Sequence, residues 1–210
     1  MKNLIILGVP RAGKSTLATV VAKKLSTTGL PLSLINADAV MGGLTAERSG
    51  GKFYKYIMRP LRHIVPGGRM RSKRQLRKKF CDFIVRFLSE TAQTSLVVFE
   101  GAYISPERAV KMFDTNRFKI VVIGYPNISV HDKCADIRKF DKRSPINSLN
   151  EADMMARVSG LIKASQDYYK FCKKHNIEFV DTSYDYHGAI QHFADRVIAF
   201  LDDSNSPSAQ

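Results

Sequence analysis

The sequence lacks the features that mark disulfide-bonded and membrane-spanning proteins. Its 210 residues include only three cysteines, Cys81, Cys134 and Cys172, which lie far apart and form no CxxC pair. This pattern predicts reduced thiols rather than a disulfide framework or a zinc site. No apolar run approaches the roughly 20 residues that a helix needs to cross a bilayer, and the first residues do not have the pattern of a signal peptide. We therefore expect a cytoplasmic protein without a membrane span.

Acidic residues are missing from one long stretch of the chain. None lies between Glu47 and Asp82, whereas the same stretch holds twelve of the 33 Lys and Arg residues. Removing these twelve charges from the formal net charge of +14 leaves +2 for the rest of the chain. So basic a segment predicts an anionic partner, such as substrate phosphates, a nucleic acid or an acidic membrane surface. The twelve residues are Arg48, Lys52, Lys55, Arg59, Arg62, Arg69, Arg71, Lys73, Arg74, Arg77, Lys78 and Lys79.

Five short apolar runs predict β-strands, and helical patterns lie between them. Most of the runs are continuous rather than alternating, which is typical of strands buried on both faces of a parallel sheet. Alternating strands and helices predict an α/β fold with three layers, in which helices cover both faces of a parallel five-stranded sheet. We expect one domain over 1–202 and a disordered tail over 203–210. The predicted strands are 3–9, 32–37, 96–101, 118–125 and 177–182.

The helical patterns have recognisable starts and apolar faces. Helices are expected over 15–25, 72–91 and about 187–201. Two further helices are expected to be capped by Ser129 and Ser148, each of which has an acidic residue three positions later. The apolar face of the helix over 72–91 is expected to consist of Leu76, Phe80, Phe83, Ile84, Phe87 and Leu88.

The stretch "GVPRAGKS", residues 8–15, matches the P-loop pattern G-x-x-x-x-G-K-[ST] between an apolar strand and a helix. Gly8 and Gly13 allow backbone N–H groups to wrap around phosphate oxygens, and the new helix directs its positive end at the same anion. Lys14 supplies a mobile charge for the β- and γ-phosphates, and the Ser15 hydroxyl can ligate Mg²⁺. The motif therefore predicts a nucleoside triphosphate site.

The expected nucleotide contacts extend over most of this loop and into the first turn of the helix. For Arg11, two interpretations stay open: its side chain reaches phosphate, or it points to solvent. The sequence has no NKxD motif, which GTPases use to bind guanine. It also has no LSGGQ motif of ABC-type ATPases, because the weakly similar "ERSGG" at 47–51 comes too soon after the P-loop. The expected nucleotide-binding residues are Gly8, Arg11, Ala12, Gly13, Lys14, Ser15 and Thr16.

With this P-loop and layout, the sequence resembles the small P-loop kinases. These include nucleoside monophosphate kinases, shikimate and gluconate kinases, chloramphenicol phosphotransferase, the zeta toxins and the polynucleotide kinases. The resemblance covers the whole chain in layout, but only the P-loop is a sharp motif. It implies transfer of the γ-phosphoryl group of Mg²⁺-bound ATP to a hydroxyl or phosphate of a small, anionic or hydroxyl-bearing molecule. It also implies an acceptor-binding lobe at about 40–92 and a lid at about 127–165.

The resemblance implies roles for four further residues. Asp38, in "INADAV", would face the acceptor hydroxyl; the alternative is that it only caps the next helix. Glu100, in "FEGAY", would position Mg²⁺ through water or bind a substrate hydroxyl, unless it is a polar strand end without a ligand. Arg138 and Arg143 would close over the transferring phosphoryl group, and the alternative there is a solvated basic loop.

Three interpretations of the basic segment stay open, and they lead to different functions. It binds a small anionic acceptor, or it binds a nucleic acid through residues 48–79, or it coats a solvated face of the helix over 72–91. The second interpretation corresponds to a polynucleotide 5′-hydroxyl kinase. A further alternative is a nucleotide-binding switch, which hydrolyses ATP slowly while the basic segment engages a partner.

Overall fold

The computed structural model describes residues 2–41, 68–142 and 144–203. It contains a five-stranded, fully parallel sheet with the strand order β2-β3-β1-β4-β5. This confirms the predicted fold class, and each strand agrees with its predicted range to within two residues. The strands are β1 (Asn3–Gly8), β2 (Leu32–Asn36), β3 (Leu96–Gly101), β4 (Phe118–Gly124) and β5 (Glu178–Asp181).

Helices connect the strands in the predicted alternation. The tail over 204–210 and residues 42–67 of the expected acceptor lobe lie outside the described residues. No helix of the described residues is long and apolar enough to cross a membrane. The helices are α1 (Lys14–Leu25), α4 (Gly68–Thr91), α5 (Pro106–Met112), α6 (Val130–Phe140), α7 (Glu151–Lys174) and α8 (Tyr186–Asp203), with 3₁₀ turns η1 (Ser26–Thr28) and η3 (Pro145–Ser148).

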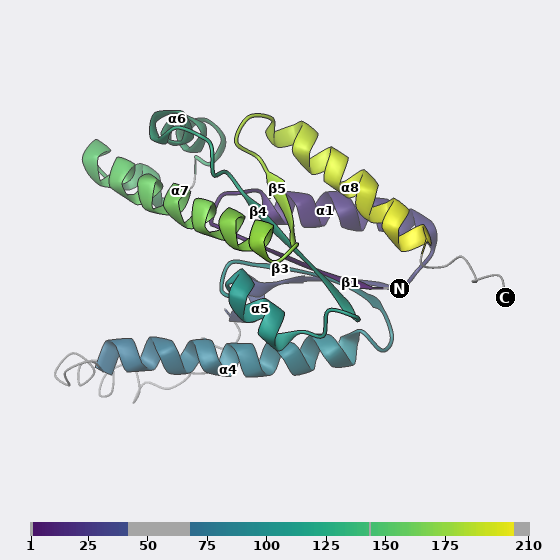
Figure 1. The fold of residues 1–210 in the computed structure, drawn as a ribbon. Coiled ribbons are helices and arrows are strands. Elements are labelled where there is room, and N and C mark those ends of the chain that lie inside the picture. Colours follow the sequence, from purple (N-terminus) through teal and green to yellow (C-terminus); the bar gives the residue numbers. More distant parts are fainter. Residues whose placement is uncertain (1, 42–67, 143, 204–210) are drawn as a thin grey trace.

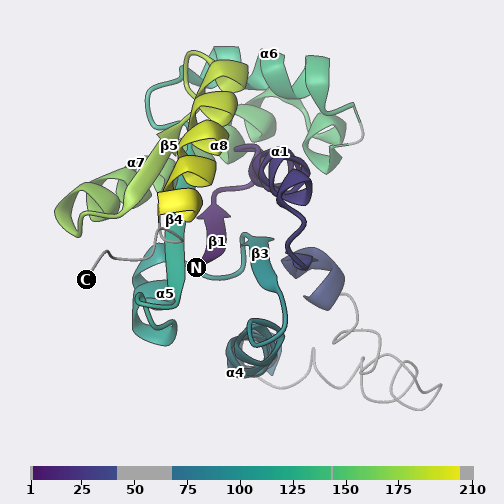
Figure 2. The same cartoon turned by 90° about the vertical axis from the view of Figure 1, so that its right-hand side faces the viewer.

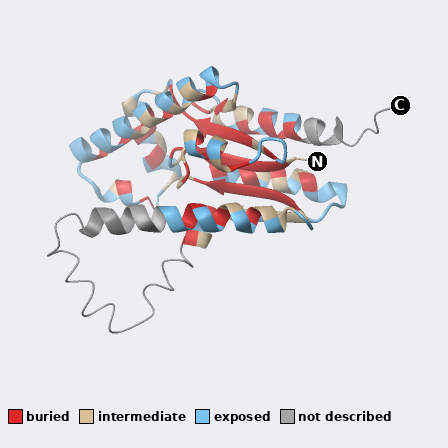
Figure 3. Ribbon diagram, turned by 60° about the horizontal axis from the view of Figure 1, so that its bottom comes forward, coloured by how far each residue is buried: buried red, intermediate tan, exposed pale blue. Residues whose placement is uncertain are grey.

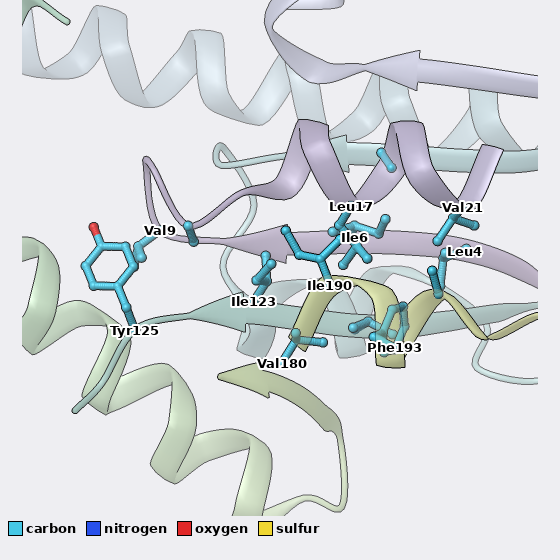
Figure 4. Close-up of a cluster of buried hydrophobic side chains, with 14 of the residues drawn as sticks. Leu4, Ile6, Val9, Leu17, Val21, Ile123, Tyr125, Val180, Ile190 and Phe193 are labelled. Atoms are coloured by element: carbon cyan, nitrogen blue, oxygen red, sulfur yellow. The ribbon is translucent and has the colours of Figure 1, made fainter. Parts of the chain in front are cut away.

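The helices form a layer on each face of the sheet, α1 and α8 on one and α4 and α5 on the other (Figures 1 and 2). Successive residues of a strand point to opposite faces, so β1 contributes to two cores. Leu4 and Ile6 pack with Phe193 of α8 (Figure 4), whereas Ile5 and Leu7 pack in the core under α4. The three central strands are buried along their length (Figure 3). The sheet is therefore a rigid base whose strand ends carry the loops of the site.

The side chains of α4 divide differently from the prediction. Phe80, Ile84 and Leu88 are fully buried against the sheet, as expected. Phe83 and Phe87 are exposed instead, and their rings stack on each other with centroids 5.5 Å apart. Positions 80, 84 and 88 form one stripe along a helix, and Cys81 and Val85 beside this stripe also pack in the core under α4. The prediction of a wide apolar face was wrong for the two phenylalanines.

One of the two predicted helix caps is confirmed and the other is wrong. The Ser129 hydroxyl accepts a hydrogen bond from the Asp132 backbone N–H at 3.0 Å and caps α6. The cap of α7 is Asn150, whose side chain accepts from the Asp153 N–H at 2.8 Å. Ser148 ends the turn η3 instead, and its hydroxyl donates within that turn. The proline-initiated turn thus takes up the residues that the sequence pattern assigned to the helix start.

The three cysteines are all buried, and none of them forms a disulfide in the described part of the chain. Among the described residues, no group of three or more His, Cys, Asp or Glu side chains could hold a metal ion.

Candidate nucleotide-binding site

The P-loop turns sharply between the carboxyl end of β1 and the start of α1. Gly13 has a φ of +98°, and a Cβ atom at this position would lie 2.7 Å from the Tyr186 ring. Gly8 has a φ of +152°, and a Cβ atom there would collide with the Ile123 carbonyl of β4. Both conformations are rare for residues with a side chain. The two glycines are therefore required by the backbone path and by its close approach to neighbouring elements.

Three successive carbonyls of the loop accept hydrogen bonds from side chains behind it. In a trans peptide the C=O and the following N–H point in opposite directions. The N–H groups that follow these carbonyls therefore point away from the supporting side chains, which is the orientation that an anion requires. The contacts join the Tyr125 hydroxyl to Pro10 O (2.8 Å), Lys133 Nζ to Arg11 O (3.2 Å) and the Thr182 hydroxyl to Ala12 O (3.4 Å). Figure 4 shows Tyr125 beside Val9, at the loop end of the core under α1 and α8.

Lys14 is a buried cation at the start of α1. Its side chain is 8% exposed, and Nζ donates a hydrogen bond to the Val9 carbonyl of its own loop at 2.9 Å. Burial lowers the pKa of Lys14, while the nearby carboxylates of Glu100 and Asp38 oppose this shift. The ammonium group thus lies within the loop, next to the loop backbone and near two acidic side chains.

A hydroxyl, a carboxylate and an amide meet beside Lys14, at the ends of β2 and β3. The Ser15 hydroxyl donates to Glu100 Oε1 at 2.9 Å, and the Asn36 side-chain amide donates to the same oxygen. Asn36 and Glu100 are direct partners in the pairing of β2 with β3, and Glu100 is 4% exposed. Hydroxyl and carboxylate oxygens are the ligands that Mg²⁺ prefers. Ser15 and Glu100 therefore fit a magnesium site whose other ligands come from phosphate and water.

Asn36 was missed in the sequence, and it changes the interpretation of Asp38. The Asn36 side-chain oxygen accepts a hydrogen bond from the Ala39 N–H at 3.0 Å and caps the helical turn over 37–41. Asp38 is therefore not the cap. Its side chain is exposed, and its charge lies close enough to the Tyr103 hydroxyl to affect the pKa of that group. Burial first, and then Asp38, raise the pKa of Tyr103.

Of the two arginines proposed for the lid, the structure describes only Arg138, which pairs with the neighbouring helix rather than with the P-loop. Arg138 of α6 approaches Glu151 of α7 at 3.9 Å, and both side chains are largely exposed. Arg143 lies outside the described residues. Arg11, by contrast, leaves the P-loop and reaches the segment after α6, where Nε lies 3.0 Å from Asp141 Oδ2. The sequence interpretations of Arg11 did not include this contact, because nothing in the spacing of the residues links positions 11 and 141.

No protein-family model matches the chain, and no curated protein sequence matches it. Solved structures do match. A gluconokinase from Sinorhizobium meliloti 1021 is 12% identical over 97% of each chain, with a TM-score of 0.52. TT1252 from Thermus thermophilus is 14% identical over 95% of this chain and 98% of its own, with a TM-score of 0.54. The chain has the fold of the small P-loop kinases. At these identities the likeness concerns the fold alone.

On this P-loop kinase fold, the residues singled out in the sequence divide into two groups. Lys14, Ser15 and Glu100 are brought together, with Asp38 close enough to affect the pKa of Lys14. Arg138 stands apart from them on α6, paired with a residue of the neighbouring helix. The first group alone forms a site that could bind a nucleotide and a hard cation.

Proposed function

We propose that this chain is an ATP-dependent kinase. It transfers the γ-phosphoryl group of Mg²⁺-bound ATP to a hydroxyl or phosphate of a small-molecule acceptor. The observation that carries the proposal is the meeting of Lys14, Ser15 and Glu100 at the carboxyl ends of β1 and β3. In open α/β sheets, ligands bind outside the carboxyl ends of the strands. The P-loop kinase fold, together with this cluster, supports a phosphotransferase.

The donor half of the site consists of the loop backbone, Lys14 and Ser15. The loop N–H groups and the first turn of α1 hold phosphate oxygens. Lys14, whose Nζ donates to the Val9 carbonyl at 2.9 Å, would exchange this partner for the β- and γ-phosphates. Ser15 and Glu100 would hold Mg²⁺, which when bound neutralises charge on the phosphate oxygens.

The acceptor half of the site begins at Asp38. This carboxylate is exposed just after β2, and it lies near both Lys14 and the Tyr103 hydroxyl. A carboxylate in this position accepts the proton of an attacking hydroxyl or aligns that hydroxyl with the γ-phosphate. Arg138 and Arg143 remain part of the proposal as lid residues that stabilise the transferring group.

A transfer assay with γ-labelled ATP and Mg²⁺ tests the proposal. The purified protein is incubated with pools of nucleosides, nucleotides, sugars, small hydroxy acids, aminoglycosides and 5′-hydroxyl oligonucleotides. We expect label in one small-molecule pool, abolished by Lys14→Ala. Lys24→Ala is a matched control, because Lys24 lies in the same helix but is paired with Asp195 on the surface.

Two other results would point to the alternatives. Label in the oligonucleotide pool alone would indicate a polynucleotide 5′-hydroxyl kinase that uses residues 48–79. Label appearing only as free phosphate, at a rate that no pool changes, would contradict a kinase and favour a nucleotide-binding switch.

A further inference from the structure

Arg11 has a conformation that a residue with a side chain rarely adopts. Its φ is +62°, in the left-handed region, although it is neither glycine nor asparagine. Such a conformation persists when surrounding contacts hold it in place, and it is a reason to search for a role. Contacts at both the main chain and the side chain of Arg11 supply this support.

The side chain of Arg11 is bound by residues that follow α6. Nε lies 3.0 Å from Asp141 Oδ2, and Nε and Nη2 donate to the Ser144 hydroxyl at 2.9 and 2.5 Å. The Arg11 side chain is 23% exposed and that of Asp141 43%. Hydrogen bonds between charged groups are stronger than neutral ones, and partial burial limits their screening by solvent.

The main chain of Arg11 is bound by α6 itself. Lys133 donates from Nζ to the Arg11 carbonyl at 3.2 Å, and the same Nζ lies 4.0 Å from the centre of the Tyr125 ring. Lys133 is 6% exposed, so this cation is held among protein groups rather than in water. One helix and the residues just after it therefore hold a single P-loop residue from two directions.

We propose that Arg11 is a positioning residue that fastens the α6–α7 connection to the donor loop. We define the α6–α7 connection as residues 141–142 and 144–150. The guanidinium has a carboxylate and a hydroxyl as partners, and both belong to this connection, so we assign it the role of joining the two segments. The significance for catalysis rests on the proposed function, in which this connection belongs to the lid over the transferred phosphoryl group. Because of this contact, the order of the donor loop and the position of the lid depend on each other.

Hydrogen exchange in the free protein tests the fastening without any nucleotide. Arg11→Met removes the charge but keeps an unbranched side chain at this position, and Asp141→Asn removes the partner charge. We expect either variant to speed amide exchange in the α6–α7 connection about threefold to tenfold. The double variant should add little to either single change, because both remove the same contact. Asp195→Asn, which breaks the surface pair with Lys24, is the matched control and should leave this exchange unchanged.

Titration with a non-hydrolysable analogue of Mg-ATP separates fastening from phosphate binding. We expect Kd to change less than about threefold in Arg11→Met, whereas loss of an arginine that binds phosphate weakens affinity about tenfold or more. Once an acceptor is known, kcat should fall in Arg11→Met and Asp141→Asn, while KM for ATP should change less than about threefold. Arg11→Lys, which keeps the charge but loses the planar geometry, should show an intermediate effect. It replaces Arg11→Met if that variant does not fold.

Two results would overturn the inference. One is unchanged exchange in the α6–α7 connection in both single variants. The other is a loss of affinity of about tenfold in Arg11→Met that Asp141→Asn does not share. Absence of analogue binding to the unmodified protein would instead contradict the proposed function, and the exchange result would still decide whether Arg11 fastens the connection.

Discussion

Lys14 is a buried cation, and its burial disfavours the charged form of the side chain in the folded state. Burial lowers its pKa below 10.5 because the ammonium group loses water that the Val9 carbonyl and the nearby carboxylates replace only in part. Between the lowered pKa of the folded state and 10.5, the unfolded chain binds more protons than the folded one. The destabilisation by this group is therefore fully present below that window and disappears as pH rises through it.

Lys14→Met should consequently increase stability while abolishing phosphoryl transfer. A side chain of similar length without the charge should raise the free energy of unfolding at pH 7 by up to about 1 kcal/mol. The gain should shrink as pH rises towards 10.5. Denaturant unfolding of both proteins at pH 7 and above pH 9 measures this change, and a gain that grows with pH would contradict the explanation.

Asp38→Asn separates the acceptor half of the site from the donor half. The amide keeps the shape of the side chain but cannot accept a proton, so kcat should fall about 10²- to 10⁴-fold. Affinity for Mg-ATP should stay nearly the same, because no hydrogen bond of the described residues joins Asp38 to the P-loop backbone. Steady-state kinetics beside a binding titration distinguish the two effects. A variant that keeps its turnover would favour the nucleotide-binding switch.

At the residue scale, the sequence was sufficient to predict site residues that belong to one motif. It was insufficient to predict residues that only the fold brings together. Lys14 and Ser15 could be predicted because the P-loop fixes their spacing. Asn36 and Tyr125 could not, since each acts on a residue more than 60 positions away, across neighbouring strands. Tyr103 stands in the quoted "FEGAY", but its proximity to Asp38 depends on how β2 and β3 pair.

At the scale of elements, local patterns located the strands and helices but not every boundary. Continuous apolar runs identified the strands most clearly at β1, β3 and β4, because strands buried on both faces show no alternation of apolar and polar residues. The start of α7 was placed wrongly, since Ser148 and Asn150 both suit a cap and only the turn η3 decides between them. The exposed pair Phe83 and Phe87 shows the same limit, because the sequence cannot reveal how much of a helix the sheet covers.

Asn150→Ala tests the assignment of the cap. Loss of the bond to the Asp153 N–H leaves an unpaired donor in the first turn of α7, and should lower the free energy of unfolding by about 1 kcal/mol. Ser148→Ala should cost less than about 0.5 kcal/mol, because it removes only a hydroxyl contact within η3. Chemical denaturation compares the two, and a larger effect at Ser148 would restore the cap that the sequence favoured.

At the scale of the whole molecule, the order of the strands assembles the site. β1 lies between β3 and β4, so the P-loop has Glu100 on one side and Tyr125 on the other. The sequence predicted five parallel strands but not their order, and the order determines which distant side chains become neighbours. Twelve basic residues between Glu47 and Asp82 remain the main source of the net charge. That this segment binds the acceptor stays a prediction.

Calorimetric titration of Mg-ATP into the purified protein tests the central claim most directly. The site described predicts binding of one nucleotide per chain, weakened by at least about tenfold in Lys14→Ala and unchanged in Lys24→Ala. Mg²⁺ should strengthen the binding, and Glu100→Gln should reduce that effect. Absence of binding, or equal affinity in the unmodified protein and Lys14→Ala, would contradict a nucleotide site at the P-loop.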